Sequence, residues 1–394
     1  MTTGLRLTGR LRTCLIMGSL VTGCCTGAAA AANGSTEVST LSHHSETNTA
    51  KSWNPQAAAT YLDRRQSWWM EWPRAQRDHQ TFCISCHTAL PYALSRSALR
   101  ATLGEQGPSP NEGRLVESVT KRVRLWNEID PFYKDADRGP NKSVESRGTE
   151  SVLNALILSS RDAHTGQLSN DARTAFENMW GQQRTAGQQK GAWLWLRFKN
   201  EPWEADDSDY FGATLAAVAI GIAPGDYRAT PEIQTRLKLL REYLNREFAE
   251  QTIINRVLLL WADAKLPGLL EIDRRKALIA ELLEKQQSDG GWSLSSLSGG
   301  WKRADGTPQE TISDGYATGL ITFVLQRAGV SREDANLKRG LGWLTANQDK
   351  SEGSWSAYSL NKNKANHISP ETALFMNDAA TSYAVLSLTS ANRR

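Results

Sequence analysis

The segment Gln286-Gln287-Ser288-Asp289-Gly290-Gly291-Trp292 decides the fold that we predict for this chain of 394 residues. It follows an apolar helical segment at 275–283 and joins a glutamine pair to a Gly-Trp pair through a polar turn. Two further copies occur, a looser one at 176–193 and a longer one at 339–355. A pattern that recurs at long intervals indicates repeated supersecondary units. The other predictions therefore start from these repeats.

Each Gly-x-Trp or Gly-Trp element is followed, after a polar stretch, by the start of a second helix. These starts combine Asp or Asn with a later threonine, in Asp209-Tyr210-Phe211-Gly212-Ala213-Thr214, Asp314-Gly315-Tyr316-Ala317-Thr318 and Asn377-Asp378-Ala379-Ala380-Thr381. A glutamine side chain at the end of one helix can hydrogen-bond to the start of the next, while the indole covers the joint. The acidic residues, including those at 201–209, are expected to cap helices.

These elements resemble the QW repeats of squalene/hopene cyclases and their protein prenyltransferase relatives. The resemblance covers roughly residue 143 to the C-terminus, and more weakly the chain back to residue 51. It implies an α/α toroid, in which inner helices surround an axis and outer helices wrap them. The family's catalytic motifs do not carry over, because the acidic run reads Asp206-Asp207-Ser208-Asp209-Tyr210 and no cysteine follows Cys86. A shared fold alone says little about activity.

Six small hydroxyl residues mark six expected inner helices, each followed by an apolar run: Thr88, Ser151, Thr214, Thr252, Thr318 and Thr381. Their outer partners are expected at 55–72, 112–128, 171–183, 231–249, 272–287 and 332–348. We found no convincing strand alternation. The sequence therefore predicts an all-α protein, a closed (α/α)6 toroid that forms a single domain over residues 51–394.

The segment Phe82-Cys83-Ile84-Ser85-Cys86-His87-Thr88 carries the chemistry. A CxxCH pattern is typical of c-type haem attachment, because each thiol forms a thioether with a haem vinyl group and the histidine ligates the iron. A lone disulfide and half of a zinc site are the alternatives, although zinc needs about four protein ligands. We predict one covalent haem c, held by Cys83 and Cys86 and ligated by His87, at the start of the first inner helix.

A second iron ligand is expected in the loop before the last inner helix, which neighbours the first helix in a closed ring. Met376 and His367 are the main candidates, with His79 and Met70 as further ones, and methionine would give a higher potential than histidine. Packing at a helix start for Met376 and a solvated loop position for His367 are the alternatives. An open sixth position would favour small-ligand or peroxide chemistry over electron transfer.

The first 32 residues read as an export signal, with arginines before a short apolar run. Val21-Thr22-Gly23-Cys24 resembles a bacterial lipoprotein cleavage site, which would make Cys24 the lipid attachment point; the alanines at 28–32 offer ordinary cleavage instead. Residues 33–50 are rich in Ser and Thr and are expected to be a flexible tether. Export to the periplasm agrees with haem attachment, which takes place outside the cytoplasm.

The composition is that of a globular protein, with 40% hydrophobic and 22% charged residues. A net charge of +4 with interspersed signs gives no indication of nucleic-acid binding. The leading hypothesis is an exported, lipid-anchored c-type haem protein in electron transfer or haem redox chemistry, with a redox partner protein. The alternatives are a haem-assisted enzyme for an apolar or isoprenoid-like substrate and a haem-based sensor. The sequence indicates no oligomeric state.

Overall fold

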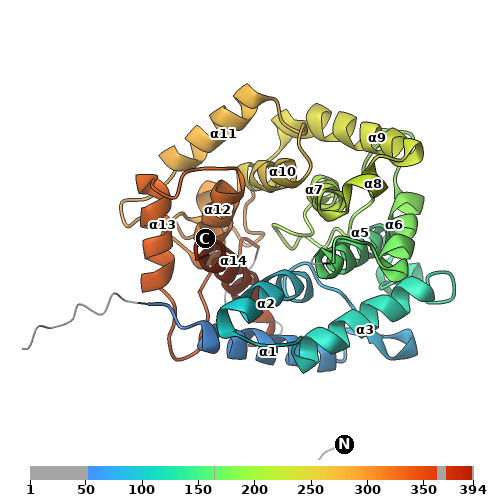
Figure 1. The fold of residues 1–394 in the computed structure, drawn as a ribbon, viewed down its shortest axis with the longest axis horizontal. Coiled ribbons are helices and arrows are strands. Elements are labelled where there is room, and N and C mark those ends of the chain that lie inside the picture. The colour runs from blue at the N-terminus through green and yellow to red at the C-terminus, as the bar shows by residue number, and fades with distance from the viewer. Residues whose placement is uncertain (1–51, 164, 362–369, 393–394) are drawn as a thin grey trace, which may run out of the picture. The chain divides into compact units, whose positions relative to one another are not determined.

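The helices form an inner and an outer layer, as Figure 1 shows. The computed structural model describes residues 52–163, 165–361 and 370–392, which belong to the compact unit Thr49–Arg394. Fourteen α-helices run through these residues, and the strands β1 (Gln76–Arg77) and β2 (Thr81–Phe82) form a short antiparallel hairpin. The prediction of an all-α protein is confirmed. The hairpin directly before the CxxCH segment was not expected, since two-residue strands leave no alternation in the sequence.

The inner helices are α2 (Ala89–Leu103), α5 (Lys142–Asp162), α7 (Ser208–Ile222), α10 (Ile253–Lys265), α12 (Gly315–Arg327) and α14 (Phe375–Ala391). The outer helices are α1 (Pro55–Glu71), α3 (Pro110–Arg124), α6 (Asn170–Gln182), α9 (Pro231–Glu247), α11 (Ile272–Glu284) and α13 (Ala335–Ala346). Two single-turn helices, α4 (Asp135–Arg138) and α8 (Gly225–Arg228), lie in connections. Short 3-10 turns occupy Asp78–Gln80, Phe248–Glu250, Leu294–Ser296 and Thr372–Leu374.

Burial distinguishes the two layers. Every residue of α7 from Ser208 to Ile220 is buried, as is typical of a helix surrounded by protein. In the outer helix α9, by contrast, the buried positions recur at helical spacing on one face, at Ile233, Leu237, Leu240, Tyr243 and Leu244. Thr88 and Thr252 directly precede α2 and α10, as predicted, whereas the other four hydroxyl residues lie inside their helices. For example, α5 begins at Lys142 rather than Ser151. In α12 the side chain of Asp314 caps the first turn, and Thr318 instead accepts a hydrogen bond from the Trp292 N–H.

Three glutamines make the same joint between the layers. Each donates its side-chain N–H groups to a carbonyl in its own turn and to a carbonyl at or near the start of the next outer helix. The pairs are Gln183 to Gly191 and Arg236, Gln286 to Gly290 and Asn336, and Gln348 to Gly353 and Asn54. The indole that follows donates back to the preceding outer helix, from Trp193 to Met179, Trp292 to Leu282 and Trp355 to Leu344. The predicted role of the Gln–Trp pattern is therefore observed.

The start of the described chain is joined to its C-terminal part in two places. Gln348 accepts from the backbone N–H of Asn54 at 2.6 Å and donates to the carbonyl of the same residue at 3.0 Å. Asp378 of α14 forms a buried ion pair with Arg65 of α1, with oxygen–nitrogen distances of 2.7 and 2.9 Å. Because the two ends of the described chain are held together, α14 lies beside α1 and α2.

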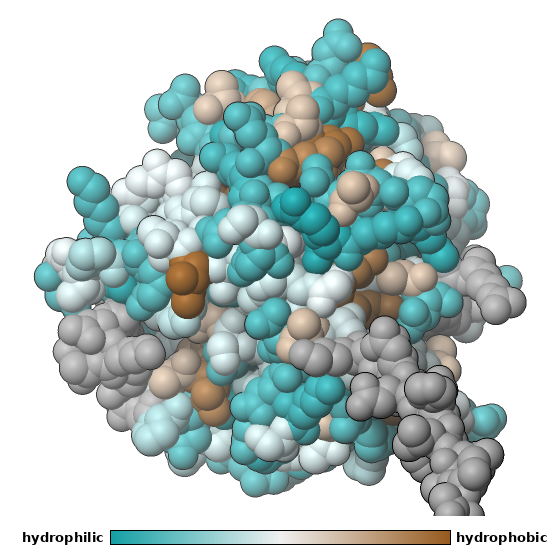
Figure 2. Space-filling model, turned by 90° about the vertical axis from the view of Figure 1, so that its left-hand side faces the viewer, coloured by the Kyte–Doolittle hydropathy of each residue, from teal (hydrophilic) through white to brown (hydrophobic). Residues whose placement is uncertain are grey.

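The surface in Figure 2 is mainly hydrophilic, with small and separated hydrophobic spots. The large hydrophobic side chains that are exposed among the described residues are Val144, Ile272 and Ile312. Scattered exposed residues of this kind are normal for a soluble domain surface. Within the described ranges, no helix combines the length and hydropathy needed to cross a membrane.

The ion pair between Arg65 and Asp378 gives the first prediction. Asp378→Asn leaves the Arg65 guanidinium buried without a counter-charge, which should lower the free energy of unfolding by about 3 kcal/mol. The neighbouring pair Arg64–Glu352 is more than half exposed at both side chains, so Glu352→Gln should change it by less than about 1 kcal/mol. Chemical denaturation of both variants checks this. If Asp378→Asn and Glu352→Gln lower the free energy of unfolding equally, burial does not decide how much an ion pair contributes.

Candidate functional site

The CxxCH residues form the tight connection between β2 and α2. Cys83 extends the hairpin, since its N–H donates to the carbonyl of Ala75 at 2.8 Å and its carbonyl accepts from the Trp69 indole at 2.6 Å. The Ser85 hydroxyl accepts from the N–H groups of Thr88 and Ala89 and so caps the start of α2. These bonds leave the two thiols and the imidazole on one short turn.

Both cysteines are buried and are not joined by a disulfide in the structure. Burial raises the pKa of the Cys83 thiol to about 11 and that of the Cys86 thiol well above its usual value, and the carboxyl of Glu204 acts in the same direction on both. The thiols are therefore protonated at neutral pH. Because the thiolate is the reactive form, they are poor nucleophiles in the folded chain.

Hydrogen bonds fix the tautomer of His87. Its Nδ1 lies 2.9 Å from the Thr88 hydroxyl, and that hydroxyl donates its only hydrogen to Asp378 at 2.8 Å. The hydroxyl must therefore accept from His87, which places the ring hydrogen on Nδ1 and leaves the lone pair on Nε2. Burial raises the pKa of Asp378, but Arg65, Tyr61 and Thr88 all donate to its oxygens and favour the carboxylate.

Aromatic rings surround the His87 imidazole. Phe375 stacks on it at 3.8 Å between ring centroids, Trp69 meets it edge-on at 5.1 Å, and Trp203 is tilted against it at 5.5 Å. Burial lowers the pKa of His87 to about 3, and the positive charge of Arg65 acts in the same direction. The imidazole is therefore neutral, which is the form that ligates a metal.

A pocket of about 190 Å³ adjoins this cage. It is lined by Trp72, Phe198, Asn200, Trp203, Glu204, Ser359, Asn361, Thr372, Ala373, Phe375 and Met376. Pockets for drug-sized ligands usually measure about 300–1,000 Å³. The donor set of Cys83, Cys86 and His87 fits the attachment chemistry of a c-type haem, whereas the pocket is too small for a whole macrocycle. Accommodating one requires side chains of this cage to move.

Glu204 is a pocket residue that the sequence did not single out, since the acidic run at 201–209 was expected to cap helices. Its backbone closes a turn by accepting from the Phe198 N–H at 3.0 Å, and neighbouring Glu201 is bound at both backbone groups to the Asn361 side chain. Burial raises the pKa of Glu204 to about 7, against the effect of Asn200, which donates to it at 3.5 Å. A carboxyl that exchanges its proton near neutral pH therefore lines the pocket.

The other predicted residues fall in different places. Met376 is buried and lines the pocket, next to the Phe375 that stacks on His87. His367 and Cys24 lie outside the described residues. Asp314 caps α12 as expected, but Asp378 belongs to the ion pair with Arg65. In the part of the chain that the structure describes, no cluster of three or more His, Cys, Asp or Glu side chains could hold a metal ion.

Comparison with known proteins gives no family for this chain: no protein-family model matches it, and no curated protein is significantly similar to it.

The pKa of Glu204 gives the second prediction. A carboxyl with a higher pKa in the folded than in the unfolded state favours folding when protonated, so this contribution is lost as the pH rises from about 4.5 to about 7. The glutamine of Glu204→Gln does not titrate, so the free energy of unfolding of this variant should fall by about 2 kcal/mol less than that of the parent chain as the pH rises. Denaturation at pH 5 and pH 8 measures it, with Glu117→Gln on the exposed face of α3 as control. An unchanged pH dependence in Glu204→Gln would show that this carboxyl titrates normally.

Proposed function

We propose that this protein is an exported c-type haem protein that works in electron transfer or haem redox chemistry. The observation that carries the proposal is the CxxCH turn, in which His87 is neutral, enclosed by aromatic rings, and hydrogen-bonded through Nδ1. Its Nε2 lone pair is the one that an iron ion would need. In this proposal Cys83 and Cys86 hold a single haem covalently, and the bound group supplies one-electron redox chemistry.

The described residues have defined roles in this proposal. Thr88 and Asp378 hold the imidazole in one orientation, and a hydrogen bond at Nδ1 raises the basicity of the ligand. Arg65 favours the carboxylate form of Asp378 against the effect of burial, and Trp69, Trp203 and Phe375 enclose the imidazole. Because both thiols are inaccessible and protonated in the folded chain, we expect the haem to be attached before the chain folds.

We also propose that the scaffold is an (α/α)6 toroid of the squalene-cyclase type. Two observations support it: the inner and outer helices alternate along the chain, and the same Gln–Trp joint occurs three times. The bonds between Gln348 and Asn54 would be the closure of the ring. The export signal over residues 1–32 and a lipid anchor at Cys24 belong to this proposal, with a periplasmic redox partner and association with the membrane through the lipid.

Small-ligand chemistry at the haem is a second candidate function. Glu204 favours it, because a carboxyl with a pKa of about 7 in this pocket can donate or accept a proton at neutral pH. Because the pocket measures only about 190 Å³, it gives little support to the hypothesis of an isoprenoid-like substrate. A sensor role would use the same pocket without turnover.

Covalent attachment is the third prediction. Protein expressed in the periplasm should show the pyridine haemochrome spectrum of a haem with both vinyl groups saturated, and the haem should stay with the chain after denaturation. Cys83→Ala with Cys86→Ala should abolish this covalent haem, whereas Ser85→Ala in the same turn should retain it. Haem that persists after denaturation of the double variant would refute the proposed attachment.

The sixth ligand is the fourth prediction. Met376→Ala should convert a low-spin absorption spectrum to a high-spin one, because it removes the candidate ligand at the pocket. Met179→Ala is the control, since Met179 is also buried, in α6, but does not line the pocket and is not a candidate ligand. His367→Ala tests the other candidate. If none of the three variants changes the spin state, neither candidate ligates the iron.

A further inference from the structure

A second pocket of about 350 Å³ lies between α2, α3 and α5. It lies toward the C-terminal parts of α2 and α5 and the first turns of α3, whereas the CxxCH turn precedes the start of α2. Its volume falls within the range of about 300–1,000 Å³ that is usual for small-molecule sites. It therefore offers more room than the pocket beside His87 and shares no residue with it.

The walls of this pocket divide into an apolar and a polar part. Leu115 and Val116 of α3 and Ile157 of α5 supply apolar surface, while Arg100, Arg161 and Glu112 supply charge. A ligand that matches both parts must be amphipathic, because burying a charged group against the apolar wall alone would be unfavourable.

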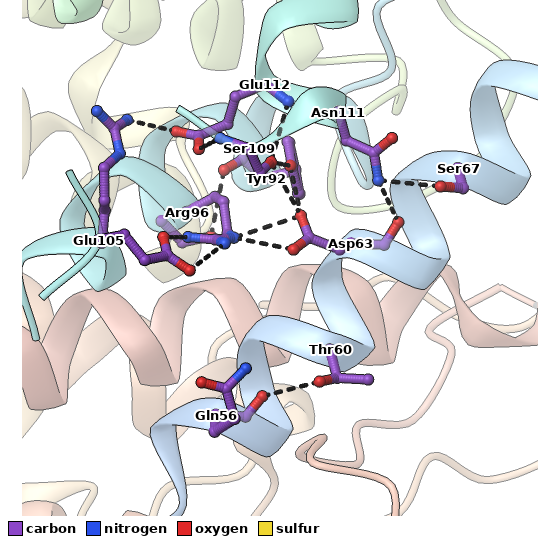
Figure 3. Close-up of polar contacts among 12 residues, drawn as sticks. Gln56, Thr60, Asp63, Ser67, Tyr92, Arg96, Glu105, Ser109, Asn111 and Glu112 are labelled. Carbon is purple, nitrogen blue, oxygen red and sulfur yellow. Dashed lines mark hydrogen bonds and ion pairs between the residues drawn. The ribbon is translucent and has the colours of Figure 1, made fainter. Parts of the chain in front are cut away.

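The hydrogen bonds determine which charge the ligand should carry. Figure 3 shows Glu112 in the capping box with Ser109: one of its oxygens accepts from the Ser109 N–H at 2.7 Å, and the other accepts from Arg100 at 2.5 Å. Each carboxylate oxygen therefore already accepts one hydrogen bond. Arg100 keeps a buried Nε, and Ser160 a buried hydroxyl, without a hydrogen-bond partner among the described residues.

The polar part of the lining holds two guanidinium groups and one carboxylate: Arg100 pairs with Glu112, and Arg161 pairs with Asp162 at 2.8 Å. The groups left without a partner are the Arg100 Nε, which is a donor, and the Ser160 hydroxyl. A carboxylate complements this arrangement, because it accepts hydrogen bonds only and pairs with arginine in a planar geometry. A cationic head group would meet the arginines instead of a free acceptor.

We propose that this pocket binds a single-chain carboxylic acid of medium length, with its carboxylate at Arg100 and its alkyl chain against Leu115, Val116 and Ile157. The proposal does not rest on the proposed haem function, because the site uses other residues and needs no cofactor.

Gly113 makes a sharp test possible. It lies in α3 at the pocket, and a Cβ built on it would meet no atom within 4 Å. Gly113→Leu should therefore fill the pocket without strain, and it should also favour the helix. Gly342→Leu is the matched control, since Gly342 is an exposed glycine inside α13, also has open space at its Cβ and does not line the pocket.

Binding of decanoate, decyltrimethylammonium and decanol to the full chain is measured by calorimetry below their micelle concentrations. We expect decanoate to bind with 1:1 stoichiometry, at least tenfold more tightly than the other two. We expect at least tenfold weaker binding to Gly113→Leu and unchanged binding to Gly342→Leu. No binding of decanoate to the parent chain, equal affinity for the cationic amphiphile, or the same affinity in Gly113→Leu as in Gly342→Leu would overturn the proposal.

Discussion

The carboxylate of Asp378 connects the parts of this molecule that are farthest apart in the chain. It accepts hydrogen bonds from Tyr61 and Arg65 of α1 and from Thr88 at the start of α2. A buried charge is tolerated only when such partners surround it, so α1, α2 and α14 have to keep their mutual positions. The same carboxylate orients His87 through Thr88. The buried contact between α1 and α14 and the orientation of His87 therefore depend on one group.

The Gln–Trp joints are a second constraint on the structure, and they occur at three places in the described residues. Each glutamine satisfies carbonyl groups that a helix end or a turn would otherwise leave unpaired, and each indole donates to the end of the preceding outer helix. The indole bond and one of the glutamine bonds lie within each repeat, which explains why the motif can be recognised in the sequence, whereas the other glutamine bond reaches the next outer helix. Asp378 works differently, because its partners come from two other helices, α1 and the start of α2.

Two pockets with different chemistry result from this arrangement. The pocket beside His87 is small and carries a carboxyl that titrates near neutral pH, so it suits proton exchange with a small ligand. The pocket between α2, α3 and α5 is larger and combines apolar walls with unpaired donors. The first belongs to the proposed redox function, whereas the second is independent of it.

The sequence by itself determined the all-α class, the approximate bounds of the outer helices and the role of the Gln–Trp joints, because helical periodicity and turn chemistry are local. It also indicated the CxxCH segment and Met376. Only the tertiary structure decided that Asp378 is an ion-pair partner and that Glu204 lines the pocket beside His87. The reason is distance along the chain: Thr88 and Asp378 are 290 residues apart, and no local pattern encodes which buried groups meet.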